Sequence, residues 1–317
     1  MSSTVVILCW FFFLLTVGYF LPVIKSKSLS RRLAWMLVAI TTFAAVQFSL
    51  NQTPVIRMII IVSLLLLSVK VVVFNETYVG TPRLNFIQWT AFAIGWFGMQ
   101  PMSFETLPST PLPSGKIFMK GAWAIVLGIA VLHISITIEY SFLHSLAGIL
   151  TLLGISLVLH FGILNLCTAF WRILGVNVRE LFRSPYKSMS IREFWGKRWN
   201  IAFSEMTTLI IFRPLKEKHS TKFSMIAAFL FSGLLHEIAI SVPVRSGYGL
   251  PFLYFVIHAG VMVVEGESTF IKKILKHKFI ARTWVAGWII VPLPLLFHTA
   301  FIGQVLNPIR NEIAFFF

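Results

Sequence analysis

The chain has 317 residues, of which 57% are hydrophobic and 12% charged, against about 25% charged in a soluble globular domain. This composition excludes an ordinary water-soluble protein and predicts an all-α, polytopic integral membrane protein, built from apolar spans of roughly 20 residues each. All eleven acidic residues are Glu, which excludes mechanisms that require Asp, including the usual Ser-His-Asp triad.

The net charge of +16 does not point to nucleic acid as a partner, because the basic residues gather between the apolar runs. Four lie in 25–32, eleven in 172–222 and five in 272–282. Cytoplasmic loops carry such an excess of Lys and Arg, and anionic membrane lipids attract it. We therefore expect these segments on the cytoplasmic face of a bacterial inner membrane or of the endoplasmic reticulum.

Nine apolar runs predict eight to ten membrane-spanning helices. The first run, Thr4 to Ile24, is followed rather than preceded by positive charges, so we expect a retained helix with its N-terminus outside rather than a signal peptide. The remaining runs cover roughly 33–50, 55–74, 86–100, 121–138, 142–171, 223–243, 250–266 and 284–305.

This assignment contains a conflict in topology. Five predicted crossings separate 25–32 from 172–222, whereas two segments on the same face require an even number. The run 142–171 is too long for one simple crossing and could be tilted, kinked or broken. Either it crosses twice in short pieces or a neighbouring run is re-entrant, and the sequence leaves both solutions open.

Two segments do not resemble spans. Residues 101–113 contain four prolines, which predicts an extended loop or lid. In 172–222 basic, aromatic and apolar residues alternate, as in helices that lie in the membrane interface. Without a repeat or a soluble segment, we expect one transmembrane domain over 1–317, with N-terminal helices in 1–80 and a motif-bearing core in 180–305.

The sequence predicts no metal site. Cys9 and Cys167 lie in apolar stretches without CxxC spacing. His236 and Glu237 open like the zinc-binding pattern HExxH, but Ile240 stands where the second histidine is needed.

The polar residues of the apolar run 223–243 mark one candidate site. His236 lies about 20 Å into this run if it is helical, and ionisable residues at such depth usually face the protein interior or a water-filled cavity. A neutral imidazole there could act as a general base near neutral pH. The alternative is a histidine that only packs. The adjoining Glu237 and the nearby Gly233 strengthen the catalytic interpretation.

A second candidate site is the sequence Phe194-Trp-Gly-Lys-Arg-Trp-Asn200. Trp195 and Trp199 flank a glycine and two cations, Lys197 and Arg198, which suits an interfacial turn that grips an anionic or amphipathic ligand. The alternative is an aromatic-belt anchor whose cations extend to the membrane surface.

These two motifs together resemble the signature of the membrane-bound O-acyltransferases, and the closest branch is the wax-synthase-like group. The family's asparagine and histidine correspond to Asn200 and His236. The resemblance covers about 85–305, most securely 180–305. It includes Gly98, Met99, Pro101 and Phe104, the segment Gly249-Leu-Pro-Phe-Leu-Tyr-Phe with His258 and Glu265, and Pro292-Leu-Pro-Leu-Leu-Phe-His298.

The resemblance implies acyl transfer from coenzyme A to a hydroxyl group inside a tunnel that crosses the membrane. His236 would take the proton of the alcohol, and Asn200 would orient the reactants or stabilise the oxyanion. Glu237 could fix the tautomer of His236 or pair with a cation. Lys197 and Arg198 could bind the phosphates of coenzyme A, or only anchor the loop. Acyl-CoA would be a co-substrate, with no resident cofactor.

The acceptor implied by the resemblance is a fatty alcohol, a sterol or another lipid-like alcohol, and the acyl chain length and oligomeric state are not predicted. A competing interpretation is a transporter in which His236, Glu237 and Glu265 relay protons. A non-catalytic scaffold is a third. The transporter interpretation lacks two matching halves with discontinuous helices, and it leaves the tryptophan-rich motif without a role.

Overall fold

The computed structural model describes residues 3–139 and 144–315, and these residues form helices and connecting loops without a strand. Eight helical segments of the described chain are long and apolar enough to cross a membrane, as expected from the composition. They cover Thr4–Val23, Lys27–Phe48, Pro54–Tyr78, Gly115–Ile138, Leu146–Ile173, Thr221–Val244, Leu250–Glu267 and Lys278–Leu296.

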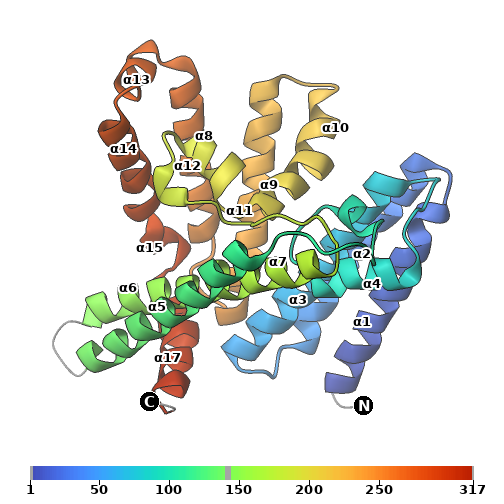
Figure 1. Cartoon of the computed structure of the whole chain (residues 1–317), viewed down its shortest axis with the longest axis horizontal. Coiled ribbons are helices and arrows are strands. Elements are labelled where there is room, and N and C mark those ends of the chain that lie inside the picture. Colours follow the sequence, from blue (N-terminus) through green and yellow to red (C-terminus); the bar gives the residue numbers. More distant parts are fainter. Residues whose placement is uncertain (1–2, 140–143, 316–317) are drawn as a thin grey trace.

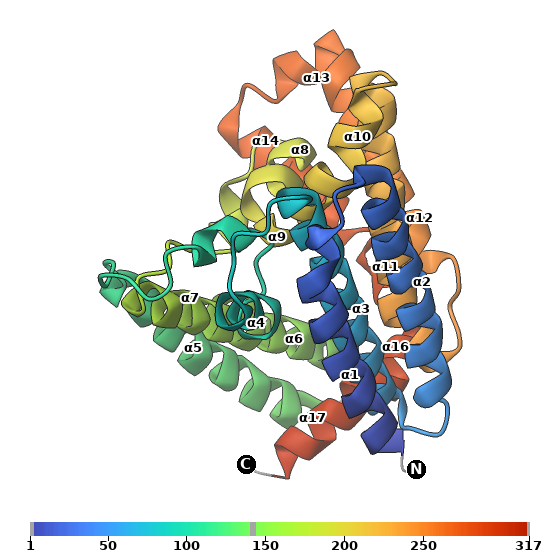
Figure 2. The same ribbon diagram turned by 90° about the vertical axis from the view of Figure 1, so that its right-hand side faces the viewer.

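Three bundles of elements build the molecule (Figures 1 and 2). The N-terminal helices α1 to α3 stand beside the pair α11 and α12, while α5 and the α6–α7 segment lie steeply inclined to both groups. Their bounds are α1 Ser3–Phe20, α2 Lys27–Phe48, α3 Pro54–Tyr78, α5 Gly115–Glu139, α6 His144–Ser156, α7 Leu164–Ile173, α11 Thr221–Val244 and α12 Leu250–Glu267.

Shorter helices connect and cap these bundles. The remaining α-helices are α4 Phe86–Gly95, α8 Ile191–Glu193, α9 Ile201–Thr207, α10 Arg213–Lys216, α13 Thr269–Ile274, α14 Lys278–Ile290, α15 Leu293–Leu296, α16 Thr299–Phe301 and α17 Asn307–Ala314. The 3₁₀ turns are η1 Leu21–Val23, η2 Pro101–Phe104 and η4 Pro185–Lys187. The π-helical turns are η3 Leu157–Ile163, η5 Phe194–Arg198, η6 Thr208–Phe212 and η7 Ile302–Leu306.

The predicted span 86–100 is wrong. Helix α4 has only ten residues and ends at Gly95. The fully buried ammonium group of Lys70, on α3, donates hydrogen bonds to the carbonyls of Phe92 and Trp96, and the Trp171 indole donates to the Gly95 carbonyl at 2.7 Å. These donors satisfy the last carbonyls of α4, so the helix can end inside the protein.

Removing this span resolves the conflict in topology. Four long helices, α2, α3, α5 and the α6–α7 segment, now separate 25–32 from 172–222, an even number. The run predicted at 142–171 crosses once, as α6, η3 and α7 joined end to end; its residues 142 and 143 lie outside the described residues. The predicted run 284–305 is also displaced, because the apolar helix starts at Lys278 and the span ends at Leu296.

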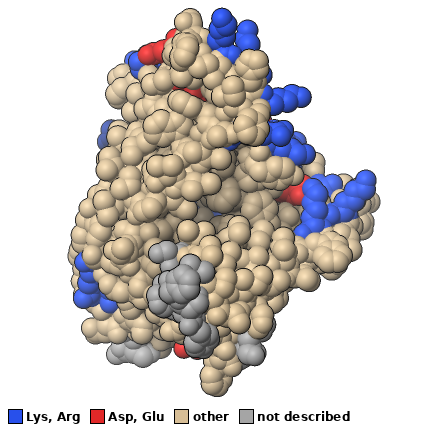
Figure 3. Space-filling model, turned by 90° about the vertical axis from the view of Figure 1, so that its left-hand side faces the viewer, with Lys and Arg blue, Asp and Glu red and all other residues tan. Residues whose placement is uncertain are grey.

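The basic residues lie at one end of the bundle. In Figure 1, α8, α10 and α13 occupy the upper end, and both termini lie at the lower end. Lys and Arg side chains gather at the upper end and along one flank of the surface in Figure 3. All but four of the 27 Lys and Arg residues lie in the connections at this end or in the adjoining helical turns. The positive-inside rule therefore predicts that the upper end faces the cytoplasm.

The proline-rich segment 101–113 begins with the 3₁₀ turn η2 and continues as an extended loop. The Ser109 and Leu112 N–H groups donate to the carbonyls of Leu174 and Arg172, at 3.3 and 2.8 Å. These bonds hold the loop against the end of α7.

The revised topology predicts that residues on either side of α4 share one face of the membrane. In a Cys9→Ser, Cys167→Ser background, Thr81→Cys and Thr110→Cys should both react with an impermeant maleimide from the side that labels Lys276→Cys. Tyr248→Cys should react only from the other side. Labelling of Thr81→Cys and Thr110→Cys from opposite sides would restore the crossing at 86–100.

Candidate active site

The segment 190–200 brings Asn200 to the interior through a sharp change of backbone direction. Helix α8 leads into the π-helical turn η5, and Asn200 follows with φ 43° before α9 begins. Asn adopts this left-handed conformation more readily than most residues. The Asn200 side-chain oxygen accepts a hydrogen bond from the Phe203 N–H at 3.3 Å. The side-chain NH₂ of Asn200 is thus left to donate to a ligand.

His236 is held in one tautomer by its own helix. It lies about 22 Å along α11, at 1.5 Å per residue. Its Nδ1 lies 2.7 Å from the Ser232 carbonyl oxygen. A carbonyl can only accept, so Nδ1 carries the proton and donates it, and the lone pair of the neutral ring resides on Nε2. The ring lies between Phe203 and Phe255, with centroids 5.4 and 4.3 Å away.

Asn200 and His236 line the same cavity, which has a volume of about 170 Å³. Its walls come from η5, α9 and η6 on one side and from α11 and α12 on the other. Most of the lining is aromatic or apolar. The lining residues are Arg192, Trp195, Gly196, Trp199, Asn200, Phe203, Ser204, Thr207, Thr208, Phe212, Met225, Ala228, Phe229, Ser232, His236, Phe255 and Met262.

Trp195 and Trp199 both line this cavity, and their rings hold the turn between neighbouring elements. Trp199 stacks on Phe194, with centroids 5.5 Å apart and planes 13° apart. Trp195 packs against Phe255 and His258 of α12, with centroids 5.4 and 5.6 Å away. The two tryptophans therefore shape the cavity wall.

The cations of the motif do not line the cavity. Arg198 donates from Nε and Nη2 to the Glu193 carboxylate at 2.7 Å, and this pair ties the two ends of η5 together. Lys197 is exposed. Burial alone would raise the pKa of Glu193, but hydrogen bonds from the Met189 N–H and from Arg198 hold it below its ordinary value. Arg198 is thus paired within the turn, which favours the anchoring role over phosphate binding.

Arg192 is the cation that lines the cavity. Its side chain is exposed, and its guanidinium nitrogen Nη2 lies 3.7 Å from the Met225 sulfur. Arg192 was not predicted from the sequence, although it lies two residues before the signature motif. Phe203 and Phe255 were also missed as neighbours of His236, because nothing in their sequence surroundings distinguishes them from packing residues.

Glu237 does not contact His236. Its carboxylate accepts hydrogen bonds from the N–H groups of Gly249 and Phe252, at 2.9 and 3.3 Å. Consecutive helical residues point about 100° apart, so Glu237 faces the start of α12. The tautomer of His236 is set by the Ser232 carbonyl instead.

The three groups of the alternative proton relay are not linked to one another. Glu265 accepts from the N–H groups of Ile191 and Arg192, Glu237 binds the start of α12, and His236 binds its own helix. The described residues also contain no group of three or more His, Cys or Glu side chains that could hold a metal ion.

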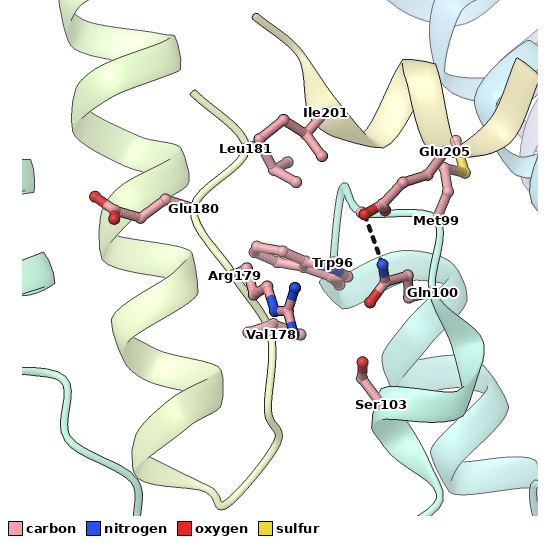
Figure 4. Close-up of a pocket in the computed structure, with 11 residues that line it drawn as sticks. Trp96, Met99, Gln100, Ser103, Val178, Arg179, Glu180, Leu181, Ile201 and Glu205 are labelled. Atoms are coloured by element: carbon pink, nitrogen blue, oxygen red, sulfur yellow. Dashed lines mark hydrogen bonds between the residues drawn. The ribbon is translucent and has the colours of Figure 1, made fainter. Parts of the chain in front are cut away.

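A second, much smaller cavity lies between the segment 96–103, the segment 178–181 and helix α9 (Figure 4). Its volume of about 10 Å³ is close to the minimum for a single water molecule. The Gln100 side-chain NH₂ donates to the Glu205 carboxylate at 2.6 Å across it, and burial raises the pKa of Glu205. This contact holds α9 against the segment that carries Gln100, and the cavity is too small for a substrate.

Together, the fold and cavity describe a multi-pass membrane protein with an asparagine–histidine site among its helices. Residues 178–257 match the family model for the membrane bound O-acyl transferase family. Over these residues the chain is similar to the membrane bound O-acyl transferase family, and the relatives that it matches are named long-chain-alcohol O-fatty-acyltransferases.

Three relatives illustrate the similarity. A probable long-chain-alcohol O-fatty-acyltransferase 9 of Arabidopsis thaliana is 26% identical over 257 residues, which cover 73% of this chain and 71% of the relative. The long-chain-alcohol O-fatty-acyltransferase of Simmondsia chinensis is 28% identical over 36% of this chain and 34% of its own length. A probable long-chain-alcohol O-fatty-acyltransferase 7 of Arabidopsis thaliana is 30% identical over 44% and 43%.

The contacts of Glu237 predict a structural role. Glu237→Ala removes the acceptor for two N–H groups at the start of α12 and should lower the free energy of unfolding by about 1 kcal/mol, as for loss of a helix cap. Thermal unfolding in detergent measures this loss. Glu267→Ala is the control, because Glu267 forms only an exposed pair with Lys222. Equal unfolding midpoints for Glu237→Ala and wild type would refute the capping role.

Proposed function

We propose that this protein transfers an acyl group from acyl-coenzyme A to the hydroxyl of a lipophilic alcohol and so forms an ester. The observation that carries the proposal is that Asn200 and His236, on different elements, line one largely apolar cavity. Thioester chemistry requires a base, a donor for the developing oxyanion and exclusion of water. The cavity offers groups suited to each requirement.

The reaction can be written with these two residues. Nε2 of His236 accepts the hydroxyl proton while the alcohol oxygen attacks the thioester carbonyl carbon. The NH₂ of Asn200 donates to the oxyanion of the tetrahedral intermediate. The carbon–sulfur bond then breaks, and the departing coenzyme A thiolate takes the proton from the imidazolium of His236. An ester and a free thiol form, and the base is regenerated.

The two substrates would enter from different surroundings. Acyl-coenzyme A is polyanionic and would approach the basic end, where Arg192 lines the cavity. The alcohol is amphipathic and would arrive from the bilayer. A cavity of about 170 Å³ is similar in size to one of about 150 Å³ that holds benzene. It therefore suits the reacting groups, and long chains would extend beyond it into a tunnel or the lipid.

The proposal is tested by incubating purified protein with a panel of acyl-coenzyme A donors and long-chain, sterol and short alcohols. Mass spectrometry should detect a new ester whose acyl part follows the donor supplied, together with an equal amount of free coenzyme A. Donor hydrolysis without ester formation would contradict acyl transfer to an alcohol.

The roles proposed for His236 and Asn200 predict a loss of kcat when either residue is replaced. His236→Ala should lower kcat at least about 100-fold, as expected for loss of a general base. Asn200→Asp keeps an oxygen to cap α9 but loses the NH₂ donor, so kcat should fall by about 100- to 1,000-fold with little change in donor KM. His219→Ala, an exposed histidine, is the matched control. More than a tenth of wild-type turnover in His236→Ala would remove the general-base assignment.

The cavity mouth predicts that Arg192 binds the donor. Arg192→Ala should raise the donor KM by about 10-fold or more, the effect of one hydrogen bond to a charged group, while kcat changes little. The donor KM of Arg192→Lys should lie between those of wild type and Arg192→Ala. Arg213→Ala, which changes another exposed arginine, should have the donor KM of wild type. Unchanged donor KM in Arg192→Ala would assign donor binding to other groups.

A further inference from the structure

Glu265 is a buried carboxylate in the last turn of α12, with 8% of its surface exposed. It accepts three hydrogen bonds from two other elements. The N–H groups of Ile191 and Arg192 donate at 2.8 and 3.3 Å, and the Trp284 indole of α14 donates at 3.0 Å. A buried carboxylate is costly unless it is hydrogen-bonded in this way.

Two of these donors begin the segment that ends at Asn200. The first N–H groups of a helix have no partner within the helix. In α8, the Ser190 hydroxyl accepts from the Glu193 N–H at 3.0 Å, and Glu265 accepts from the other two. Hydrogen bonds to an ionised acceptor are shorter and stronger than those between neutral groups. The start of the signature segment is thus bound to α12 through Glu265.

Helix α12 also contacts the His236 ring. Phe255 of α12 packs on that ring, and α12 approaches α11 closely at Gly233, where an added Cβ atom would meet Phe252 and Phe255 at 3.0 and 3.2 Å. The position of Glu265 relative to His236 is therefore fixed by tight packing. The same carboxylate also binds the N–H groups of α8, the helix that precedes the turn carrying Asn200.

We propose that Glu265 is a positioning residue that sets Asn200 relative to His236; this rests on the proposed function. Apolar packing also holds α8, because Ile191 is fully buried beside Val261 and Met262. Packing alone is not directional, whereas two N–H groups on one carboxylate fix the orientation of the turn. Displacement of a reacting group by about 1 Å can cost about 100-fold in rate.

The variants separate positioning from folding. Glu265→Ala removes the acceptor for all three donors, and Glu265→Gln keeps one acceptor oxygen and the shape. Trp284→Phe removes only the indole donor and leaves both bonds to α8. Glu267→Gln, on the same helix end, is the control. Each variant is purified in full length, and kcat, KM and the thermal unfolding midpoint are measured with hydrogen–deuterium exchange of peptides covering 189–200 and 225–240.

Glu265→Ala should lower kcat per folded protein by about 10- to 100-fold, with Glu265→Gln intermediate and Trp284→Phe close to Glu267→Gln. Exchange should accelerate in 189–200 and remain unchanged in 225–240. Wild-type kcat per folded protein in Glu265→Ala, or activity lost only in proportion to unfolded protein, would overturn the proposal. A wild type that forms no ester would refute the proposed function instead. Hydrogen–deuterium exchange would then still test whether Glu265 holds α8 in place. Unchanged exchange of 189–200 in Glu265→Ala would overturn that role.

Discussion

Polar groups within the apolar interior of a membrane protein must find their partners inside the protein. Four buried or half-buried charged side chains meet this constraint by binding backbone at the ends of helices. Lys70 binds the carbonyls that end α4, and Glu265 and Glu237 bind the N–H groups that begin α8 and α12. Arg57 donates to carbonyls in the α2–α3 connection and at Pro243 near the end of α11. These contacts allow helices to start and stop within the bundle. The cavity lies between the segment from η5 to η6 and the helices α11 and α12.

The two site residues lie on different kinds of segment, one a long helix and the other a short irregular turn. His236 lies on a long helix packed tightly against α12, and its tautomer is set by a carbonyl one turn earlier. Asn200 arrives on a short, irregular segment in which α8, a π-helical turn and a left-handed residue follow one another. Such π-helical turns are frequent at functional sites, and η5 and η6 both contribute to the cavity wall. The position of Asn200 thus depends on the hydrogen bonds at both ends of its segment.

The sequence predicted much of this architecture, and each failure has a physical reason. His236 could be proposed as a site residue because it interrupts an apolar run, and Asn200 because the motif that it ends resembles that of an acyltransferase family. The apolar run 86–100 was misassigned, because the lysine that ends α4 lies on another helix and is invisible to local hydropathy. The two roles open to Arg198 could not be separated from the sequence, because charge alone does not reveal its partner, Glu193. Neither role considered for Glu237, fixing the His236 tautomer or pairing with a cation, is the contact observed, because neighbours along a helix point in different directions and the N–H groups that its carboxylate binds lie at the start of α12.

In the proposed reaction, Asn200 and His236 act on one reacting centre in the cavity. The most direct measurement is an experimental structure of the protein bound to a non-hydrolysable thioether analogue of acyl-coenzyme A and an alcohol. The alcohol oxygen should lie within about 3.2 Å of His236 Nε2, and the group that replaces the thioester should lie within hydrogen-bonding reach of the Asn200 NH₂. A complex in which the reacting groups lie outside this cavity, with His236 and Asn200 contacting neither, would contradict it.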